Sequence, residues 1–346
     1  MNFGHILMNW YRENRRELPW RNTRNPYLIW LSEVILQQTR VQQGLPYYEA
    51  FAETYPTVEK LANAPESEVL KLWQGLGYYS RARNLLVTAQ IIEREHGGQF
   101  PKTYKELIQL KGIGPYTGAA IASFAFEEAV AVVDGNVFRV LARIYGIEID
   151  ITSSLGKKTF TELAQTLLDQ HPPSTFNQAI MEFGALHCTP QNPLCSTCPF
   201  QDVCLAFSNK KTALLPIKKK KKTSQKRFLH YAIIWDNHQQ IKVNQRTAAG
   251  IWRGLYEFPL IETEADVMPT ESDWRSLFLT DIQCASEFPI GGRTWSHKLT
   301  HQDLEIHFWE IHLNGIHEQG ITVDELYKLP VPIILHKFMV WNWGNR

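Results

Sequence analysis

The stretch Pro101–Phe126 reads PKTYKELIQLKGIGPYTGAAIASFAF, and it predicts two helices joined by a glycine turn. Thr103 followed three residues later by Glu106 is a capping box, which predicts a helix that begins here and runs to about Leu110. The turn Gly-Ile-Gly-Pro follows, where two missing Cβ atoms let the backbone bend sharply and approach a partner closely. A second helix begins directly after the turn, and its first amides have no partner within the helix.

The second helix is made of small residues, which allow it to pack closely against the first: Gly118, Ala119, Ala120, Ala122 and Ser123. Helix N-termini with open amides bind phosphate. A helix, a glycine turn and a small-residue helix in succession resemble the helix-hairpin-helix of DNA-binding proteins, here at about 103–126. The resemblance implies contacts with a DNA backbone for Gly112, Gly114 and Thr117.

Four of the five cysteines lie together, at Cys188, Cys195, Cys198 and Cys204, with the spacing C-x6-C-x2-C-x5-C. Disulfides are the first alternative, but the charged N-terminal residues are not those of a secretory signal, so we expect reduced thiols. Zinc is the second alternative, although zinc ribbons usually carry two C-x2-4-C pairs separated by a dozen or more residues. Four thiolates in one compact loop favour a cluster of four irons over zinc.

The composition is that of an ordinary globular protein, with 346 residues of which 44% are hydrophobic and 21% charged. This length predicts about two domains. Nothing approaches the roughly 18 consecutive apolar residues of a membrane helix, so we expect no membrane contact and, with reduced thiols, a cytoplasmic protein. The net charge of +1 excludes little, because a nucleic-acid binder needs positive charge only on one face.

The pattern of apolar residues divides the chain. Spacing of three to four residues predicts helices through residues 1–204, with the cysteine loop at 188–204. Residues 205–227 carry many lysines and no acid, which predicts a basic linker kept open by its own charge. From residue 228 onward, FLHYAIIW and QDLEIHFWEIHL are typical of strands, so residues 228–346 are predicted to form a second domain.

Two carboxylates in the helical region are candidates for catalysis. Glu33 lies among apolar neighbours in WLSEVIL, where partial burial would raise its pKa and keep it protonated. Asp134 begins the helix of VVDGNVFRVLAR, where capping amides and the helix dipole favour the ionised form. One protonated and one ionised carboxylate together can break a glycosidic bond. The simpler interpretations are a surface glutamate and an ordinary N-cap.

These motifs, with LPWR at 18–21, WLSEVILQQTRV at 30–41 and GLGYYSRARNL at 75–85, resemble the MutY-type adenine DNA glycosylases over most of residues 5–204. The resemblance implies a multidomain fold: an all-α helix-hairpin-helix glycosylase domain with a 4Fe-4S loop, and an α+β Nudix-like C-terminal domain. It implies removal of adenine paired with 8-oxoguanine or guanine in double-stranded DNA, by a monomer.

The resemblance also assigns roles to residues. Glu33 corresponds to the acid that protonates adenine N7, and Asp134 to the carboxylate that stabilises the oxocarbenium ion or transiently bonds C1′. Tyr116 and Asn136 correspond to residues that position them. Five residues correspond to the adenine pocket: Arg16, Leu18, Trp20, Arg21 and Gln178. Six correspond to contacts with 8-oxoguanine and the DNA around it: Gln38, Thr39, Leu76, Tyr78, Ser296 and His297.

Endonuclease III belongs to the same superfamily but cleaves the strand through a lysine Schiff base in the hairpin. Tyr116 stands at that position here, so hydrolysis of the base alone is expected. Lys111 lies on the other side of the turn and leaves weak strand cleavage open.

The C-terminal domain resembles a Nudix domain without the acidic helix that holds Mg²⁺, so recognition rather than hydrolysis is expected. His297, His301, His307 and His312 lack carboxylate or thiol neighbours and are expected to be ordinary surface histidines. Two other functions stay open: a nucleotide hydrolase, which the missing helix disfavours, and a DNA-binding protein without catalysis, which would tolerate loss of both carboxylates.

Overall fold

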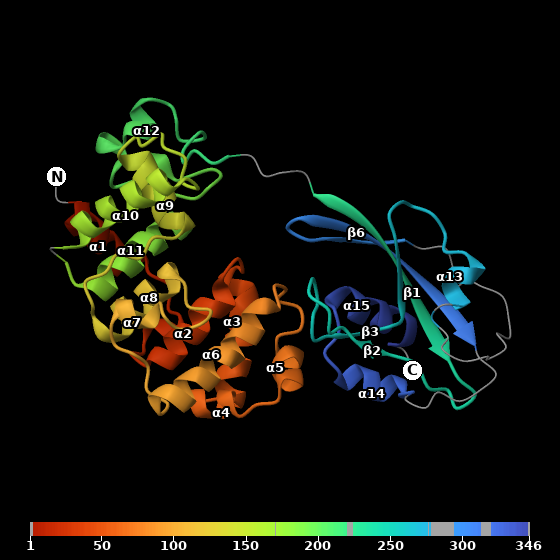
Figure 1. Ribbon diagram of the computed structural model, residues 1–346. Helices are drawn as coiled ribbons and strands as arrows, with labels where there is room; N and C mark the ends of the chain where they lie inside the picture. The colour runs from red at the N-terminus through yellow and green to blue at the C-terminus, as the bar shows by residue number, and fades with distance from the viewer. Residues whose placement is uncertain are drawn as a thin grey trace. The chain divides into compact units, whose positions relative to one another are not determined.

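The computed structural model (Figure 1) describes residues 3–169, 171–219, 224–275, 277, 294–312 and 320–344. The chain divides into two compact units, one of Met1–Asn63 with Asn84–Lys220 and the other of Ala64–Arg83 with Lys221–Arg346. The segment 64–83 thus groups with the C-terminal residues by contacts, whereas the sequence places it in the 1–204 domain. The domain limits proposed from sequence stay a prediction.

The described residues up to 219 contain helices and no strand, as expected for residues 1–204. The helices are α1 (Phe3–Asn14), η1 (Pro19–Arg21), α2 (Pro26–Leu36), α3 (Val41–Thr54), α4 (Val58–Ala62), α5 (Glu66–Leu72), α6 (Ser80–His96), α7 (Tyr104–Leu107), α8 (Pro115–Phe126), α9 (Gly135–Ile144), α10 (Ser154–Leu168), α11 (Pro173–Leu186), η2 (Cys195–Thr197), η3 (Gln201–Val203) and α12 (Leu205–Ser208).

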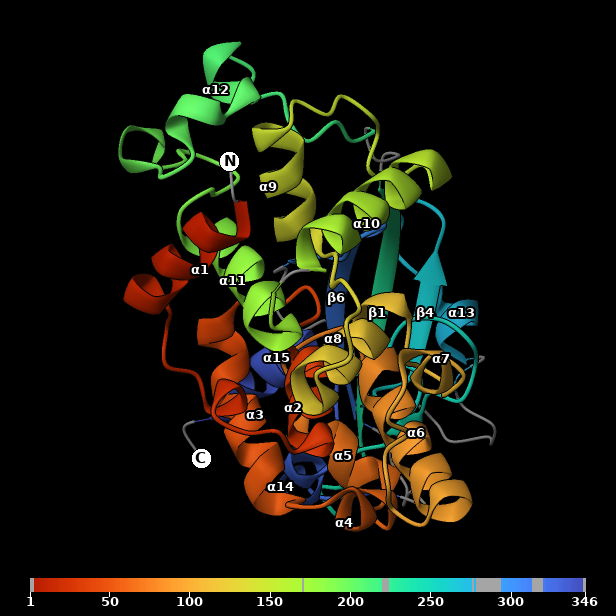
Figure 2. The same cartoon turned by 90° about the vertical axis from the view of Figure 1, so that its left-hand side faces the viewer.

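The core between α1, α9, α10 and α11 is dominated by aromatic rings. Phe183 of α11 meets Trp10 edge-on at 4.9 Å between ring centroids, and it meets Phe200 in the same manner at 5.2 Å. Phe3 stacks on Phe200 at 5.0 Å. Figure 2 shows α1, α11, α9 and α10 side by side on this part of the unit. Phe200 lies within the cysteine loop, so the loop is packed onto the same core.

The helix-hairpin-helix consists of α7 and α8. The capping box of Thr103 and Glu106 is present, but α7 ends at Leu107 rather than Leu110. The chain there tightens into i→i+3 bonds, from the Gln109 amide to the Glu106 carbonyl and from the Leu110 amide to the Leu107 carbonyl. The turn has Gly112 at φ +84, where a Cβ would lie 2.9 Å from the Asn84 Cβ. The close packing predicted for α8 is present.

The C-terminal residues form the predicted sheet. Its strands are β1 (Gln225–Trp235), β4 (Leu260–Thr263), β5 (Trp295–Lys298) and β6 (Gln302–His312), in the order β4-β1-β6-β5, with β1 and β6 parallel. A small pair, β2 (Asn244–Gln245) and β3 (Tyr256–Glu257), lies apart, and helices α13 (Glu271–Arg275), α14 (Val323–Lys328) and α15 (Ile333–Trp343) complete the fold. Phe338 of α15 stacks on Phe308 of β6 at 3.7 Å.

The linker predicted at 205–227 is narrower in the structure. Its first four residues form α12, Leu215 is buried in the helical core, and Gln225–Arg227 already belong to β1. The Ile151 amide also donates to the Ile217 carbonyl at 3.1 Å. Apolar residues between the lysines were the signal for this packing. Among the residues described, no helix is long and apolar enough to cross a membrane.

Two of the four histidines expected at the surface are partly buried. His307 of β6 stacks on the fully buried His230 of β1 at 4.9 Å between ring centroids. Burial and the neighbouring His307 lower the pKa of His230 to about 4. His297 packs beside Trp252 at 6.1 Å. His301 and His312 are exposed, in agreement with the prediction. The expected lack of carboxylate neighbours is wrong for two of the four, because His307 Nε2 lies 3.8 Å from Asp266 Oδ1 and His312 Nε2 lies 3.3 Å from Glu310 Oε1.

Candidate active site and cysteine loop

The helical unit contains a pocket of about 180 Å³. This is smaller than the roughly 300–1,000 Å³ of sites for drug-sized ligands, and it suits a single base. Ten predicted site residues line it: Arg16, Leu18, Trp20, Arg21, Glu33, Thr39, Tyr116, Asp134, Asn136 and Gln178. Residues up to 162 positions apart in sequence, Arg16 and Gln178, are therefore brought together at one pocket. Thr39, which was predicted to contact 8-oxoguanine, also lines it.

Glu33 projects from α2, a helix that is buried on nearly all sides. The helix begins at Pro26 with Asn25 as its cap, since the Asn25 side chain accepts from the Tyr27 amide. Glu33 is 7% exposed, and the Tyr116 hydroxyl donates to its Oε2 at 2.5 Å. Burial raises the pKa of Glu33 to about 7, against the opposing effects of the Tyr116 hydrogen bond and the Arg21 charge. Glu33 is not a surface residue.

Asp134 is the N-cap of α9. Its Oδ1 accepts from the amides of Asn136 and Val137, each at 2.8 Å, and its Oδ2 accepts from the Asn136 side chain at 2.7 Å. Both the cap and its effect on ionisation were predicted, and the hydrogen bonds from Val137 and Asn136 do lower the pKa of Asp134. The burial of this carboxyl was not predicted, and it raises the pKa by more than these bonds lower it, so the pKa lies above its ordinary value.

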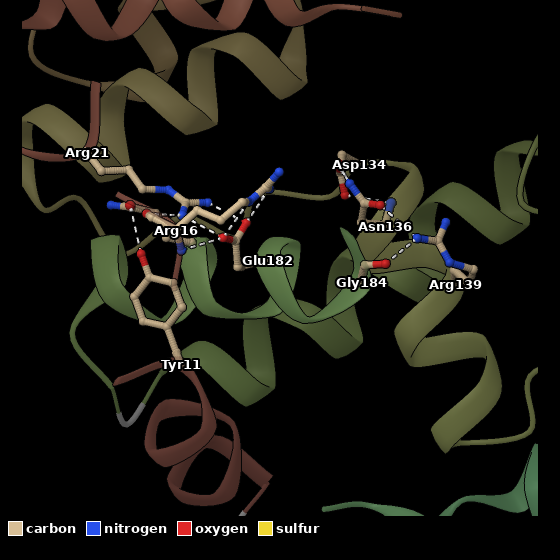
Figure 3. A network of polar contacts seen from close by, with 9 residues as sticks. Tyr11, Arg16, Arg21, Asp134, Asn136, Arg139, Glu182 and Gly184 are labelled. Carbon is tan, nitrogen blue, oxygen red and sulfur yellow. Dashed lines mark hydrogen bonds and ion pairs between the residues drawn. The ribbon is translucent and has the colours of Figure 1, made fainter. Parts of the chain in front are cut away.

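Asn136 is held in turn by Arg139, one helical turn further along α9. Arg139 donates to the Asn136 Oδ1 and to the Gly184 carbonyl, both at 2.7 Å (Figure 3). Its Nε donates to the Cys188 carbonyl at 2.7 Å. The sequence analysis did not single out Arg139. Its spacing from Asp134 in VVDGNVFRVLAR was the available signal.

Glu182 of α11 is the main residue of the pocket that the sequence analysis missed. Its carboxylate accepts from Arg16 at 2.9 Å through Nε and 2.6 Å through Nη2, and from Arg21 at 2.8 and 2.7 Å. Figure 3 shows both guanidinium groups directed at this one carboxylate. Burial would raise the pKa of Glu182, but the hydrogen bonds from Arg21 and Arg16 lower it to about 2.

The remaining wall of the pocket is apolar or neutral. Trp20 is 9% exposed and meets Tyr48 edge-on at 5.0 Å. Gln178 lies between two hydroxyl groups, because Tyr11 donates to its Oε1 at 3.2 Å and its Nε2 donates to Ser174 at 3.0 Å. Its amide is thereby held at the pocket.

The residues predicted to contact DNA differ in their exposure to solvent. Gln38 is exposed at φ +57 beyond the end of α2, and it does not line the pocket. Leu76 is buried, whereas Tyr78 is 44% exposed at φ +50. Gly112 and Gly114 are exposed at the hairpin turn.

Thr117 is buried in the first turn of α8. Its hydroxyl accepts from Gln37 Nε2 at 3.2 Å and so faces the protein interior. The contact with a DNA backbone predicted for this residue stays a prediction.

Ser296 and His297 lie on β5 rather than in a loop, and they pair with Glu305 and Leu304 of β6. Successive side chains of a strand point to opposite faces. Ser296 is exposed, while His297 is half-buried, and burial lowers its pKa. The two cannot contact one base edge from the same face of the sheet.

The cysteine loop follows α11 and is held by Arg143 of α9. Arg143 donates to the Cys188 Sγ at 3.4 Å and to the Thr189 carbonyl at 2.7 Å. All four cysteines line one small pocket. Among the described residues, no group of three or more His, Cys, Asp or Glu side chains is arranged to hold one metal ion. A cubane cluster instead binds each thiolate to a separate iron. Four thiols with a guanidinium nearby therefore fit such a cluster.

Three families match parts of the chain. The HhH-GPD superfamily of base excision DNA repair proteins matches residues 31–166, the iron–sulfur binding domain of endonuclease III matches 188–204, and the NUDIX domain matches 230–340. The match at 188–204 begins and ends at the outer cysteines. The loop therefore binds a 4Fe-4S cluster, and the zinc and disulfide alternatives are excluded.

Individual relatives are similar over most of the chain. An adenine DNA glycosylase of Buchnera aphidicola from Baizongia pistaciae is 35% identical and covers 91% of this chain and 87% of its own. The adenine DNA glycosylase of Mus musculus is 48% identical over 59% of this chain and 42% of its own. A thermostable thymine-DNA glycosylase has a TM-score of 0.56 at 31% identity, covering 60% of this chain and 95% of its own.

A structure of endonuclease III in a non-covalent DNA complex shares the fold, with a TM-score of 0.51 at 24% identity, covering 60% of this chain and 94% of its own. A relative above 30% identity that is matched over nearly its whole length establishes the family, and with it a DNA glycosylase activity. The chain is a member of the adenine DNA glycosylase family within the HhH-GPD superfamily.

Proposed function

We propose that this glycosylase hydrolyses the N-glycosidic bond of adenine paired with 8-oxoguanine or guanine in duplex DNA. One observation carries the proposal: Glu33, buried with a pKa of about 7, and the capped carboxylate Asp134 line a single base-sized pocket. A proton donor and an anion across one pocket are what breakage of a glycosidic bond through an oxocarbenium-like transition state requires.

Glu33 is the proton donor. A carboxyl group whose pKa lies near neutral pH is protonated in a large fraction of molecules and still transfers its proton readily. Protonation of adenine at N7 makes the base a better leaving group. The Tyr116 hydroxyl occupies Oε2 of Glu33, so the transferable proton is carried on Oε1.

Asp134 stabilises the sugar cation or bonds transiently to C1′. Its amide and Asn136 partners fix the carboxylate in place before the reaction, so no reorganisation is needed when positive charge develops. The developing cation lowers the pKa of this carboxyl, which counters the effect of burial.

Adenine must leave the helical stack to reach this pocket, at a cost of a few kcal/mol. Arg16, Leu18, Trp20, Arg21 and Gln178 bind the flipped base. Gln38, Thr39 and Tyr78 contact the duplex and the orphaned base, with the exposed Tyr78 as the wedge between bases. Leu76, which is buried, supports Tyr78 from within the protein. Ser296 and His297 belong to the domain that distinguishes 8-oxoguanine.

The reaction is base hydrolysis without strand cleavage. The phenol of Tyr116 cannot form a Schiff base, and burial raises its pKa well above the usual value, so it remains a neutral hydrogen-bond donor. Lys111 is exposed on the far side of the hairpin turn. We further propose that the enzyme acts as a monomer in the cytoplasm on nucleoid DNA.

Base release from a panel of duplexes tests the proposal. Each duplex contains one candidate pair: adenine opposite 8-oxoguanine, guanine, cytosine or thymine, or an oxidised pyrimidine opposite guanine. Free adenine from the first two, with strand breaks only after alkali, is the expected result. Release of the oxidised pyrimidine instead, or breaks without alkali at the rate of base release, would contradict it.

A further inference from the structure

Glu182 is a buried carboxylate in the base pocket with no role in the proposed chemistry. Its side chain is 1% exposed, yet it binds two guanidinium groups in bidentate fashion and also accepts from the Arg16 amide at 2.9 Å. Arg21 is 13% exposed and also donates to the Arg16 carbonyl at 3.0 Å. Hydrogen bonds therefore link Glu182, Arg16 and Arg21 to one another on the wall of the pocket.

The two arginines create an electrostatic difficulty for a neighbouring proton donor. A cation near a carboxyl group favours its ionised form. The Arg21 charge accordingly lowers the pKa of Glu33 and works against the effect of burial. Without compensation, the Arg21 charge would lower the pKa of Glu33 further, and a smaller fraction of the acid would carry the proton that it has to give to the base.

We infer that Glu182 is a positioning and charge-compensating residue, which orients Arg16 and Arg21 toward the base and offsets their charge so that Glu33 keeps its proton. The inference rests on the proposed role of Glu33 as the acid. Its physical basis is that one carboxylate faces both cations within 2.6–2.7 Å, and that the side chains of Glu182 and Arg21 are only 1% and 13% exposed.

The groups that act on Glu33, or on its neighbour Arg21, come from four elements. Tyr116 lies on α8, Asp134 at the N-cap of α9 and Arg21 on η1. Glu182 of α11 binds Arg21. Asp134 is already bound by amides and by Asn136, so it is not the partner of the arginines. Glu182 is the pocket carboxylate that forms an ion pair with each of the two cations.

A purely structural ion pair would have a different consequence. Breaking a buried pair destabilises a protein because it leaves a buried charge without a partner. Such a change would lower activity equally at every pH, whereas charge compensation predicts a change in the pH profile itself.

The test is the single-turnover rate of adenine release from a duplex with adenine opposite 8-oxoguanine, measured from pH 5 to 10 with the full chain and its cluster. In the parent, activity falls as pH rises through the pKa of Glu33. In Glu182→Gln, this fall moves to lower pH by about one unit, the order expected for an uncompensated nearby cation. Glu182→Asp keeps the negative charge, so its activity falls at the same pH as that of the parent, even if its rate is lower at every pH.

The double variant Glu182→Gln/Arg21→Gln removes one charge of each sign and returns the fall toward the parent pH. Should Glu182→Gln not fold, Arg21→Gln alone decides, because loss of the cation must move the fall to higher pH. An unchanged profile in every folded variant overturns the role of Glu182 while adenine release stands. If the activity of the parent does not fall at basic pH, Glu33 is not the acid, and the inference about Glu182 fails with it.

Discussion

The Tyr116 hydroxyl donates a hydrogen bond of 2.5 Å to Glu33 Oε2, which links the first turn of α8 to the last turn of α2. The helix that follows the hairpin turn thus carries the hydrogen-bond partner of the proposed proton donor. A displacement of the hairpin would be transmitted directly to the carboxyl group.

Replacement of Glu33 by Gln should abolish adenine release at all pH values, because the amide carries no transferable proton. In the parent, the raised pKa means that the protonated form is lost as pH rises through about 7. The variant should also be more stable than the parent above that pH, by up to about 3 kcal/mol, since it avoids an ionised buried carboxyl. Rate profiles and denaturant unfolding at pH 6 and 9 measure both effects.

Replacement of Tyr116 by Phe removes a hydrogen bond that lowers the pKa of Glu33. The fall of activity on the basic side should therefore move to higher pH, in the direction opposite to that expected for Glu182→Gln. The single-turnover rate at pH 7 should drop, because the carboxyl loses its orienting partner. An unchanged profile would show that the hydroxyl does not act on the acid.

Replacement of Asp134 by Asn should separate catalysis from stability. Asparagine is as good an N-cap as aspartate, so the free energy of unfolding should change little. Excision should fall by at least about 100-fold, since the neutral amide cannot stabilise a cation. Asp134→Ala is the matched control, with the same loss of activity and a further cost of about 1 kcal/mol in stability. Excision by Asp134→Asn at the parent rate would rule out the mechanism.

The positions of Ser296 and His297 on opposite faces of β5 predict different effects for their alanine variants. Ser296→Ala should reduce the preference for 8-oxoguanine over guanine without loss of stability, because its side chain is exposed. His297→Ala should lower the melting temperature, because its ring packs beside Trp252. Competition between the two duplexes and thermal unfolding measure these effects. An unchanged preference in both variants would remove this strand from base recognition.

Replacement of Cys198 by Ser removes one ligand of the cluster. We expect loss of the visible absorption of the cluster and faster proteolysis near residues 188–217, because Phe200 within the loop is part of the helical core. DNA affinity should fall more than the rate of base release from bound DNA. A variant that retains full resistance to protease would show that the loop folds without its cluster.

The sequence predicted the helices, the hairpin, the cysteine cluster and most of the pocket, since each depends on local spacing or on a matched motif. Glu182 was not predicted, because its ion pairs form only where α11 packs against the Arg16–Arg21 segment, which lies far away in the sequence. The pKa of Asp134 was misjudged because burial, which outweighs the local caps, is set by tertiary packing. His307 was misjudged because its stacking partner lies on another strand.

The packing of Leu215 and the bond between Ile151 and Ile217 also determine where the polypeptide can be divided. A helical fragment that stops at the last cysteine would lack Leu215 in its core and would leave the Ile151 amide without its partner. A fragment that extends through Ile217 keeps the packing of Leu215 and the hydrogen bond of the Ile151 amide. Gene fragments meant to yield the glycosylase half alone should therefore end beyond Ile217, because the residues after the cluster complete the folding unit.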